Sequence, residues 1–534
     1  MRTAALVYCA SLSSYATVPL EDGPSALERT LAFVRQIPGL EAVLIVDGPL
    51  ELPERTLAPL AEPSQGQRPL LRRTQAADSG AVWLLNEAAS FCSSLEKDGA
   101  GKLDALVLVS GDEPLLDPEL IGRMLQNHLR YRADYSFADG YPAGLAAELI
   151  SPQILPALSA LAAKTGEKEK KAPGTERGWL FSLIQKDINS FDIETEISPR
   201  DLREFRIELV CDTKRNTLLV ERLLEAGAGK ASALLDYIPG HLSILRTLPA
   251  FLQVQIEGGC PQTCAFCPYP LVGGDILKRR DSMPRERFSA LVSAFADFAG
   301  ESVVDISLWG EPALHPEIGA LIDDVLSHPE LSLIVETSGI GWSEGSLEKT
   351  AERWKSDSRL NFVLSLDALR PDLYASLRGP GFEEAMNTAG RLLSLFPDTA
   401  HIQTLRTRES EPALEEFWRG WKKRTDHVIV QKYSRFAGFL PERKVTDLSP
   451  LVRRPCWHLK RDFSVLLDGT VPLCRDCVRS EIKLGNVFDG PGLESIEERL
   501  ESLWKAGERY HELHVSGEYP PPCAVCDEYY TYNA

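Results

Sequence analysis

The fold is decided by Phe251-Leu-Gln-Val-Gln-Ile256 and by the stretch that follows it, Glu257-Gly-Gly-Cys-Pro-Gln-Thr-Cys-Ala-Phe-Cys-Pro268. The first part has the apolar, β-branched character of a buried strand. The second part places Cys260, Cys264 and Cys267 at C-x3-C-x2-C spacing. Three thiolates this close can hold three corners of a [4Fe–4S] cube, whereas an electron-transfer cluster usually takes four cysteines. The spacing therefore indicates a cluster whose fourth iron stays open for chemistry, and a zinc knot is the alternative.

Strand and helix patterns alternate on the C-terminal side of this stretch. Strand-like runs occur at 251–256, 303–309, 331–337, 360–366, 401–405 and 427–430. Helical patterns lie between them, at 288–295, 315–327, 343–355, 382–396 and 411–423. Successive βα units predict a parallel sheet covered by helices and curled into a partial (β/α)6 barrel of TIM type. In such a fold the functional groups lie at the carboxyl ends of the strands, where the cysteine triplet stands.

The triplet resembles the signature of radical S-adenosylmethionine (SAM) enzymes, in which the amino and carboxylate groups of SAM chelate the open iron. That family has a six-unit partial barrel and prefers an aromatic residue where Phe266 stands. Trp309-Gly-Glu-Pro312 resembles the family's Gly-Glu-Pro element, which contacts the SAM amino group. A glycine lets the backbone approach a ligand, and a carboxylate accepts from an ammonium group. The resemblance implies that Phe266, Gly310 and Glu311 form part of a SAM site.

Two further segments continue this resemblance. Leu364-Ser-Leu-Asp-Ala368 and Tyr374-Ala-Ser-Leu-Arg-Gly379 are similar to the family's Ser-Leu-Asp segment and its downstream Arg-Gly. The resemblance implies that Ser365 contacts the ribose of SAM and that Arg378 contacts its carboxylate. The alternative is that Ser365 only packs at a strand end and that Arg378 is a surface helix residue. Thr337-Ser-Gly stands where relatives show Thr-Asn-Gly, so no ligand is assigned there.

A second group of cysteines lies near the C-terminus. It comprises Cys456, Cys474, Cys477, Cys523 and Cys526. The segment from Phe463 to Cys474 contains an Asp-Gly pair and predicts a hairpin. The spacing resembles the SPASM or twitch extension of radical SAM enzymes, which binds auxiliary clusters. This resemblance implies one auxiliary [4Fe–4S] cluster, and we assign its ligands as Cys456, Cys474, Cys523 and Cys526. Cys477 could replace Cys474, approach the substrate or have no role, and a zinc ribbon is the alternative site.

The N-terminal residues predict a different α/β unit. Ala105-Leu-Val-Leu-Val-Ser-Gly-Asp112 reads as a buried strand, and Asp212 follows another apolar run. This part resembles the GT-A-like nucleotidyltransferases that activate sugars, in which two matching aspartates bind a metal. Asp112 and Asp212 are therefore candidate Mg²⁺ ligands. The family's Gly-rich, basic loop is missing from Cys9–Leu20, so we expect a retained fold with altered or lost transfer. Residues 160–180, with a basic run at 168–171, predict a mobile insertion.

Composition sets the frame for these predictions. The chain has 534 residues, a formal net charge of -19, 44% hydrophobic residues and 25% charged residues. This composition is that of a globular protein, and the acidic balance argues against a nucleic-acid partner. No apolar run is long enough to span a membrane. Cysteines grouped in this way suit metal ligation in a reducing cytoplasm better than a disulfide framework.

Three domains are predicted, at 1–235, 245–445 and 446–534. Their order is most similar to the spiro-SPASM protein family. The resemblance implies an enzyme that takes one electron from a flavodoxin- or ferredoxin-like donor and cleaves SAM reductively. The resulting 5′-deoxyadenosyl radical abstracts hydrogen from a substrate, for which a peptide or protein is favoured. The alternatives are a sugar or nucleotide-linked sugar, an active nucleotidyltransferase with an accessory barrel, and a zinc-bound scaffold.

Overall fold

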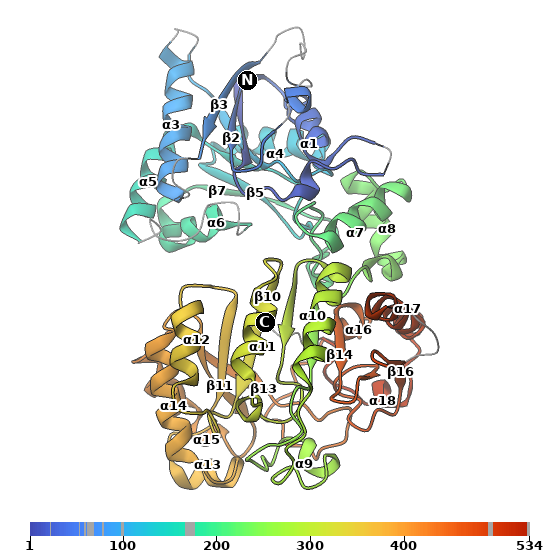
Figure 1. The fold of residues 1–534 in the computed structure, drawn as a ribbon. Helices are drawn as coiled ribbons and strands as arrows, with labels where there is room; N and C mark the ends of the chain where they lie inside the picture. The colour runs from blue at the N-terminus through green and yellow to red at the C-terminus, as the bar shows by residue number, and fades with distance from the viewer. Residues whose placement is uncertain are drawn as a thin grey trace. The chain divides into compact units, whose positions relative to one another are not determined.

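The computed structural model describes residues 1–21, 23–52, 54–57, 60, 69–76, 80–97, 101–165, 177–489 and 495–530. The chain folds into two compact units, Met1–Thr247 and Leu248–Ala534, and each is described by itself (Figure 1). The basic run at 168–171 lies outside the described residues. The flanks of the predicted insertion are partly helical, because α5 (Leu155–Lys164) and α6 (Trp179–Ile184) enter it from either side.

The second unit is built on a parallel sheet. Its strands are β8 (Phe251–Val254), β9 (Ser302–Asp305), β10 (Leu331–Thr337), β11 (Leu360–Ser365), β12 (Ala400–Arg406), β13 (Val428–Lys432) and β14 (Asp462–Val465). In the described part of this unit they form a seven-stranded sheet in the order β13-β12-β11-β10-β9-β8-β14. All neighbouring strands run parallel. The predicted α/β class and parallel sheet are confirmed, and the sheet is consistent with a partial barrel.

Helices between the strands cover one face of the sheet (Figure 1). They include α10 (Arg285–Ala299), α11 (Ile318–Leu326), α12 (Ser346–Trp354), α14 (Phe382–Leu395) and α15 (Glu411–Lys422). The other helices of the unit are α9 (Tyr269–Val272), α13 (Pro371–Leu377), α16 (Trp457–Arg461), α17 (Ile496–Val515) and α18 (Pro521–Ala524). Alternate strand residues, such as Leu333 and Val335 of β10, pack with apolar helix residues such as Leu321 in one hydrophobic core. The intervening residues, such as Ile334 and Glu336, line a cavity on the other face. This two-residue alternation separates the core from the site.

The C-terminal region joins the same unit. Strand β14 pairs parallel with β8, with Phe463 opposite Leu252. The predicted hairpin is wrong in its pairing, because β15 (Thr470–Pro472) pairs instead with β16 (Lys483–Asn486). The turn itself is present, and Gly469 takes a φ of 86° there. Strand β14 covers what would otherwise be the open edge of β8, and this pairing adds Phe463 to the hydrophobic core of the unit.

The first unit is a mixed sheet with helices. Its strands are β1 (Thr3–Cys9), β2 (Leu40–Asp47), β3 (Leu70–Gln75), β4 (Ala105–Ser110), β5 (Tyr135–Asp139), β6 (Glu148–Ile150) and β7 (Ile193–Ile197). Its further helices are α1 (Ala26–Val34), α3 (Ala81–Lys97), α4 (Pro118–Tyr131), α7 (Lys214–Glu225) and α8 (Ala231–Gly240). The strand order is β3-β2-β1-β4-β6-β5-β7, and β6 runs antiparallel to both of its neighbours.

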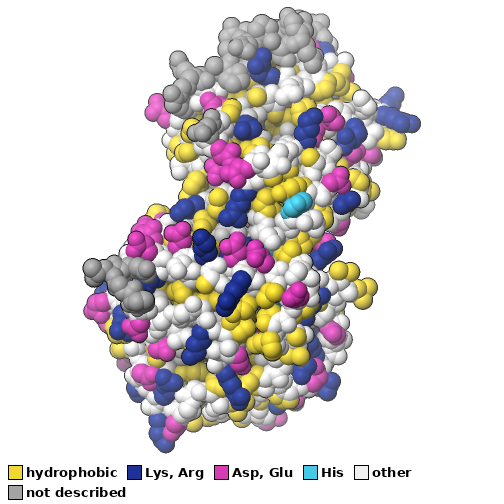
Figure 2. All heavy atoms as spheres, turned by 90° about the vertical axis from the view of Figure 1, so that its right-hand side faces the viewer, with side chains coloured by type: hydrophobic (Ala, Val, Ile, Leu, Met, Phe, Trp, Pro, Cys, Tyr) yellow, Lys and Arg dark blue, Asp and Glu magenta, His cyan; other side chains and the backbone are white. Residues whose placement is uncertain are grey.

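Two general predictions concern the surface. No helix among the described residues combines the length and the apolar character that crossing a membrane requires. On the face drawn in Figure 2, Lys and Arg side chains are scattered among Asp and Glu side chains. A nucleic-acid surface usually gathers basic side chains in a patch or stripe. The absence of a nucleic-acid partner stays a prediction.

Candidate active site

The second unit encloses a cavity of about 490 Å³ at the carboxyl ends of its strands. All three residues of the cysteine triplet line it. The residues expected at a SAM site line it as well, namely Phe266, Gly310, Glu311, Ser365 and Arg378. The fold thus gathers into one cavity the side chains that the sequence placed at the ends of three different strands.

The cysteine loop is fixed by hydrogen bonds. The Glu257 carboxylate accepts from the backbone N–H of Gly259 at 2.8 Å and from the hydroxyl of Ser282 at 2.6 Å. The N–H of Cys260 donates to the carbonyl of Ile276 at 3.0 Å. These contacts hold the loop in place, so the three thiols are presented to the same cavity.

The donor set of this loop is sulfur only. The three thiols are free, and burial, together with the nearby Glu311, raises the pKa of Cys260 to about 12. Cluster binding would therefore release protons from these thiols. In the ranges that the structure describes, no group of three or more His, Cys, Asp or Glu side chains is arranged to hold a single metal ion. Soft thiolates fit an iron–sulfur cluster, so the residues present suit that group.

Gly310, in the turn after β9, packs against the backbone of the cysteine loop. Its φ is 81°, and a Cβ there would lie 2.1 Å from the carbonyl oxygen of Glu257. The next residue, Glu311, donates its N–H to the carbonyl of Gly259 at 2.8 Å. The glycine is thus required by backbone packing against the cysteine loop, a reason that differs from the ligand approach expected from the sequence.

The Glu311 carboxylate organises the neighbouring loop. It accepts from the hydroxyl of Thr337 at 2.5 Å and from the N–H groups of Ser338 at 2.8 Å and Ala313 at 3.2 Å. Burial raises the pKa of Glu311, although these hydrogen bonds oppose the shift. A carboxylate has about four lone-pair sites, so one more donor can be accommodated.

Arg378 is buried beside the cysteines and is not a surface residue. Its Nε forms an ion pair with Asp367, and its Nη1 donates to Gln262 at 3.1 Å and lies 3.9 Å from the sulfur of Cys264. Its guanidinium lies 5.5 Å from the ring centre of Phe266. Among the described residues, Nη2 has no hydrogen-bond partner. This nitrogen is therefore available to an anionic group in the cavity.

Ser365 belongs to a polar group deeper in the cavity. Its hydroxyl donates to Glu336 at 2.9 Å, and Gln403 donates to both Glu336 and Ser365, at 2.7 and 3.1 Å. Asp305, at the end of β9, lines the same region. No sequence motif pointed to Glu336, Gln403 or Asp305 as site residues. The available signal was alternation, because buried parallel strands are usually apolar on both faces.

Asp305 carries an unfavourable charge. Burial, with Glu336 nearby, raises its pKa to about 6, while the hydrogen bond from the N–H of Ser307 at 2.9 Å opposes the shift. The residue is 7% exposed. A buried carboxylate with a raised pKa is typical of a functional position.

The C-terminal cysteines gather in a separate cluster. Cys456, Cys477 and Cys523 are buried together with Tyr529, and Cys474 packs against them. Burial raises the pKa of Cys526 well above its usual value, and nearby Cys456 and Cys474 add to the shift. The structure thus brings the four assigned cysteines together with Cys477, while the role of the four as ligands stays a prediction.

Two side chains next to these cysteines reach the barrel cavity. Arg475 follows Cys474, Glu528 lies two residues after Cys526, and both line the cavity. Glu528 pairs with Lys432, the last residue of β13. The wall of the candidate active site therefore includes the C-terminal region.

The predicted Mg²⁺ ligands of the first unit surround a guanidinium. Arg177 donates to Asp112 at 2.9 Å and to Glu113 at 3.2 Å, and it lies 3.7 Å from Asp212. Burial raises the pKa of Glu113 to about 7, although Arg177 opposes the shift. The fold brings the two predicted aspartates together, but a side-chain cation stands between them.

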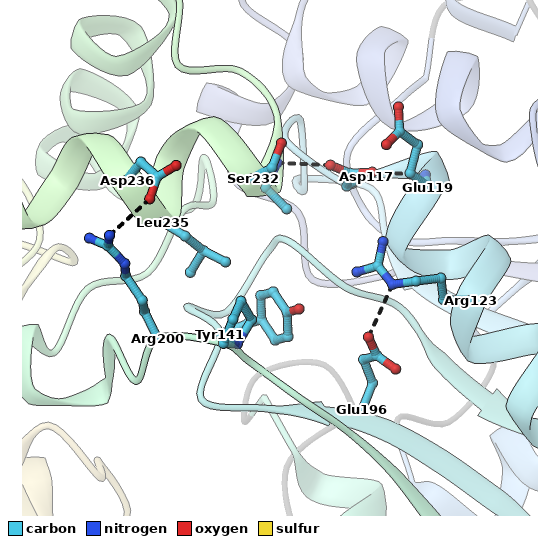
Figure 3. Close-up of a pocket in the computed structure, with 11 residues that line it drawn as sticks. Asp117, Glu119, Arg123, Tyr141, Glu196, Arg200, Ser232, Leu235 and Asp236 are labelled. Atoms are coloured by element: carbon cyan, nitrogen blue, oxygen red, sulfur yellow. Dashed lines mark hydrogen bonds and ion pairs between the residues drawn. The ribbon is translucent and has the colours of Figure 1, made fainter.

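The first unit has a cavity of its own, of about 440 Å³ (Figure 3). Its charged side chains are already paired with one another. Arg123 contacts Glu196 at 3.1 Å, and Arg200 contacts Asp236 at 3.2 Å. Asp117 caps α4 and also accepts from the N–H of Ala231 at 2.8 Å. This cavity offers no comparable unpaired charge within the described residues.

Comparison with known proteins identifies the second unit. A family model described as the radical SAM superfamily matches residues 254–417. The chain therefore contains a radical SAM domain. A protein of Treponema pallidum (strain Nichols) described as uncharacterized is 35% identical over 366 residues, which are 66% of this chain and 98% of that protein. The two chains therefore belong to the same protein family.

Two solved structures that match this chain are less similar to it in sequence than the Treponema pallidum protein is. Streptococcus suis SuiB bound to precursor peptide SuiA is 16% identical with a TM-score of 0.39, covering 70% of this chain and 89% of that chain. A cytidylyltransferase from Leptospira borgpetersenii serovar Hardjo-bovis (strain JB197) is 15% identical with a TM-score of 0.36, covering 46% of this chain and 96% of that chain.

Gly310→Ala tests the contact between the two motifs of the radical SAM barrel. Positive φ and overpacking each cost about 1–3 kcal/mol, so we expect a loss of about 2–5 kcal/mol in stability. Gly345→Ala is the matched control, because Gly345 has a φ of 74° and open space around it. Melting temperatures of the two variants check this. Equal shifts for both variants would contradict the packing argument.

Asp305→Asn tests the charge in the cavity. The folded pKa of about 6 lies above the usual carboxyl value, so ionisation destabilises the fold above that pH and has no such effect below about pH 4. We expect the variant to gain about 1–3 kcal/mol at pH 8, with the gain shrinking toward pH 5. Asp281→Asn is the control, because an Arg279 contact lowers the pKa of Asp281. A lower melting temperature for Asp305→Asn at pH 8 would refute the argument.

Proposed function

We propose that this protein is a radical SAM enzyme that cleaves SAM reductively to generate a 5′-deoxyadenosyl radical. The observation that supports this is the convergence of three free thiols, the Gly310–Glu311 turn and Arg378 on one cavity. Cys260, Cys264 and Cys267 would hold a [4Fe–4S] cluster. When bound, that cluster supplies the electron that breaks a carbon–sulfur bond of SAM.

The protein's own residues position SAM. Nη2 of Arg378 would bind the carboxylate, and the remaining acceptor site of Glu311 would bind the amino group. Ser365 is the proposed ribose contact, although its hydroxyl already donates to Glu336. The aromatic rings of Tyr269 and Trp309 stack at a centroid distance of 5.9 Å in the cavity wall. These rings exclude water that would quench a radical.

We propose that Cys456, Cys474, Cys523 and Cys526 hold one auxiliary [4Fe–4S] cluster, as in SPASM or twitch domains. Cys477 packs in the same buried group, so it could replace Cys474 as a ligand or approach the substrate. Cys477 also raises the pKa of Cys474 through a side-chain hydrogen bond, with burial adding to the shift. The buried, sulfur-rich surroundings fit such a cluster.

A peptide or protein is the proposed substrate, and a sugar or nucleotide-linked sugar is the second candidate. A flavodoxin- or ferredoxin-like protein in the cytoplasm would supply the electron. The order of the three regions supports placement in the spiro-SPASM family, with domains at 1–235, 245–445 and 446–534.

We infer that the GT-A-like N-terminal domain no longer performs nucleotidyl transfer. Metal-dependent transfer needs Asp112 and Asp212 to share a cation, and Arg177 lies within ion-pair distance of both. An active enzyme would have to withdraw this side chain before Mg²⁺ could bind between the two carboxylates.

Metal content and SAM cleavage test the main proposal. Anaerobic reconstitution is expected to give about eight irons per chain, of which about four are lost in the Cys260→Ala/Cys264→Ala/Cys267→Ala variant. With SAM and dithionite, the native protein should form 5′-deoxyadenosine and the triple variant should not. Cys92→Ala is the control, because Cys92 is a buried core thiol of the first unit. Zinc in place of iron, or no 5′-deoxyadenosine with any reductant, would overturn the proposal.

Arg177→Ala tests the assignment of the N-terminal domain. Removal of the guanidinium leaves uncompensated carboxylates, so we expect calorimetry to show Mn²⁺ or Mg²⁺ binding at least tenfold tighter than in the native protein. Arg123→Ala, which removes an exposed arginine from the same unit, should show no gain. Pyrophosphate release from a nucleoside triphosphate by the native protein, abolished in Asp112→Ala, would contradict this assignment.

A further inference from the structure

The inner face of the barrel sheet carries polar residues that the SAM motifs do not include. Gln253, Asp305, Glu336 and Gln403 lie on the β8, β9, β10 and β12 strands, and all four line the cavity. Gln253 stands opposite Asp305 in the pairing of β8 with β9. The outward residues of the same strands are apolar and belong to the core. The polar inner face therefore needs an explanation other than packing.

Asp305 and Glu336 are two carboxylates without a cation. The hydrogen bonds to Asp305 come from Ser307, and those to Glu336 come from Ser365 and Gln403, so all of these donors are neutral. Within the described ranges, neither carboxylate has a Lys, Arg or His nitrogen inside 4 Å. Their negative charges repel each other. Burial is the main cause of the raised pKa of Asp305, and the charge of Glu336 adds to it. Buried charges are normally paired.

The cations of the facing wall are shared among several carboxylates. Lys432 pairs with Glu528 and donates to the carbonyl of Asp527 at 2.7 Å. Arg475 has its nearest carboxylate in Asp476, at 3.8 Å, and its charge also opposes the raised pKa of Asp305. Lys432 and Arg475 thus stand among four carboxylates, those of Asp305, Glu336, Asp476 and Glu528, so negative charge remains in excess.

Gln253 provides a second, independent sign of a ligand. Its side chain is 1% exposed, and its Nε2 has no hydrogen-bond acceptor in the part of the chain that is described. Its Oε1 accepts from the hydroxyl of Ser464 at 3.2 Å, which leaves the amide N–H groups for another partner. A buried, unpaired donor is costly unless a ligand satisfies it.

We propose that the inner part of this cavity binds a protonated primary amine of the substrate, with Asp305 and Glu336 as its carboxylate partners. Gln253 would donate to an oxygen of the same substrate. The proposal rests on the proposed radical SAM function and adds a substrate class to it. An anionic group is disfavoured there, because two carboxylates would repel it. A lysine side chain of a peptide and an amino sugar both carry such an amine.

Calorimetry on the anaerobically reconstituted, SAM-loaded protein tests the proposal. The probes are Nα-acetyl-lysine amide and glucosamine, each with a neutral counterpart, Nα-acetyl-norleucine amide and N-acetylglucosamine. At least one amine is expected to bind tenfold or more tightly than its counterpart. Binding of the lysine derivative alone identifies a peptide source, and binding of glucosamine alone identifies an amino sugar.

Variants show whether the carboxylates are responsible. Asp305→Asn and Glu336→Gln should each weaken amine binding at least tenfold, while Glu348→Gln, an exposed acid paired with Arg391, should not. Melting curves verify that each variant is folded, and either variant suffices if the other fails to fold. Equal binding of amine and neutral probes, or binding unchanged in the folded variants, would overturn the inference. Probe binding needs no turnover, so this failure is distinguishable from an absence of 5′-deoxyadenosine.

Discussion

The whole site depends on the contact between the backbone of Glu257 and the α-carbon of Gly310. The cysteine loop follows β8, and the Gly-Glu turn follows β9, so this contact fixes two adjacent strand ends against each other. Only a residue without a Cβ fits there, because an added atom would lie 2.1 Å from the Glu257 carbonyl oxygen. Glu311 then extends the arrangement to Thr337 and Ser338 after β10. One backbone contact thus sets the geometry of three loops.

The barrel and the cysteine loop could be predicted because their signals are local. Strand β10 shows apolar residues at every second position, and α10 shows Phe288, Leu291, Val292 and Phe295 at helical spacing. The three cysteines lie within eight residues, from Cys260 to Cys267, so their spacing can be recognised without knowledge of the fold. The spacing of apolar residues predicts which face of each segment is buried, and this spacing can be read from the sequence alone.

The features that escaped prediction are made by residues far apart in the sequence. The apolar run at Phe463 could be recognised as a strand, but nothing local shows that it pairs with β8. Arg177 reaches Asp112 and Asp212 from a segment whose sequence gives no metal-site signal. Asp305 and Glu336 are ordinary acidic residues in sequence, and only the sheet puts both on the inner face. Their importance arises from the low dielectric around them, which is a property of the folded state.

The position of the C-terminal region is explained by the open edges of the barrel sheet. A sheet that does not close leaves two edge strands with unpaired backbone groups, which proteins must cover. Strand β14 covers the β8 edge, while Asp527 and Glu528 bind Lys432 at the end of β13. Arg475 enters the cavity beside Cys474, so the segments that carry the C-terminal cysteines also supply the cavity wall. Loss of the C-terminal region would therefore expose the β8 edge and open the cavity to water, which makes this region part of the active site and not an appendage to it.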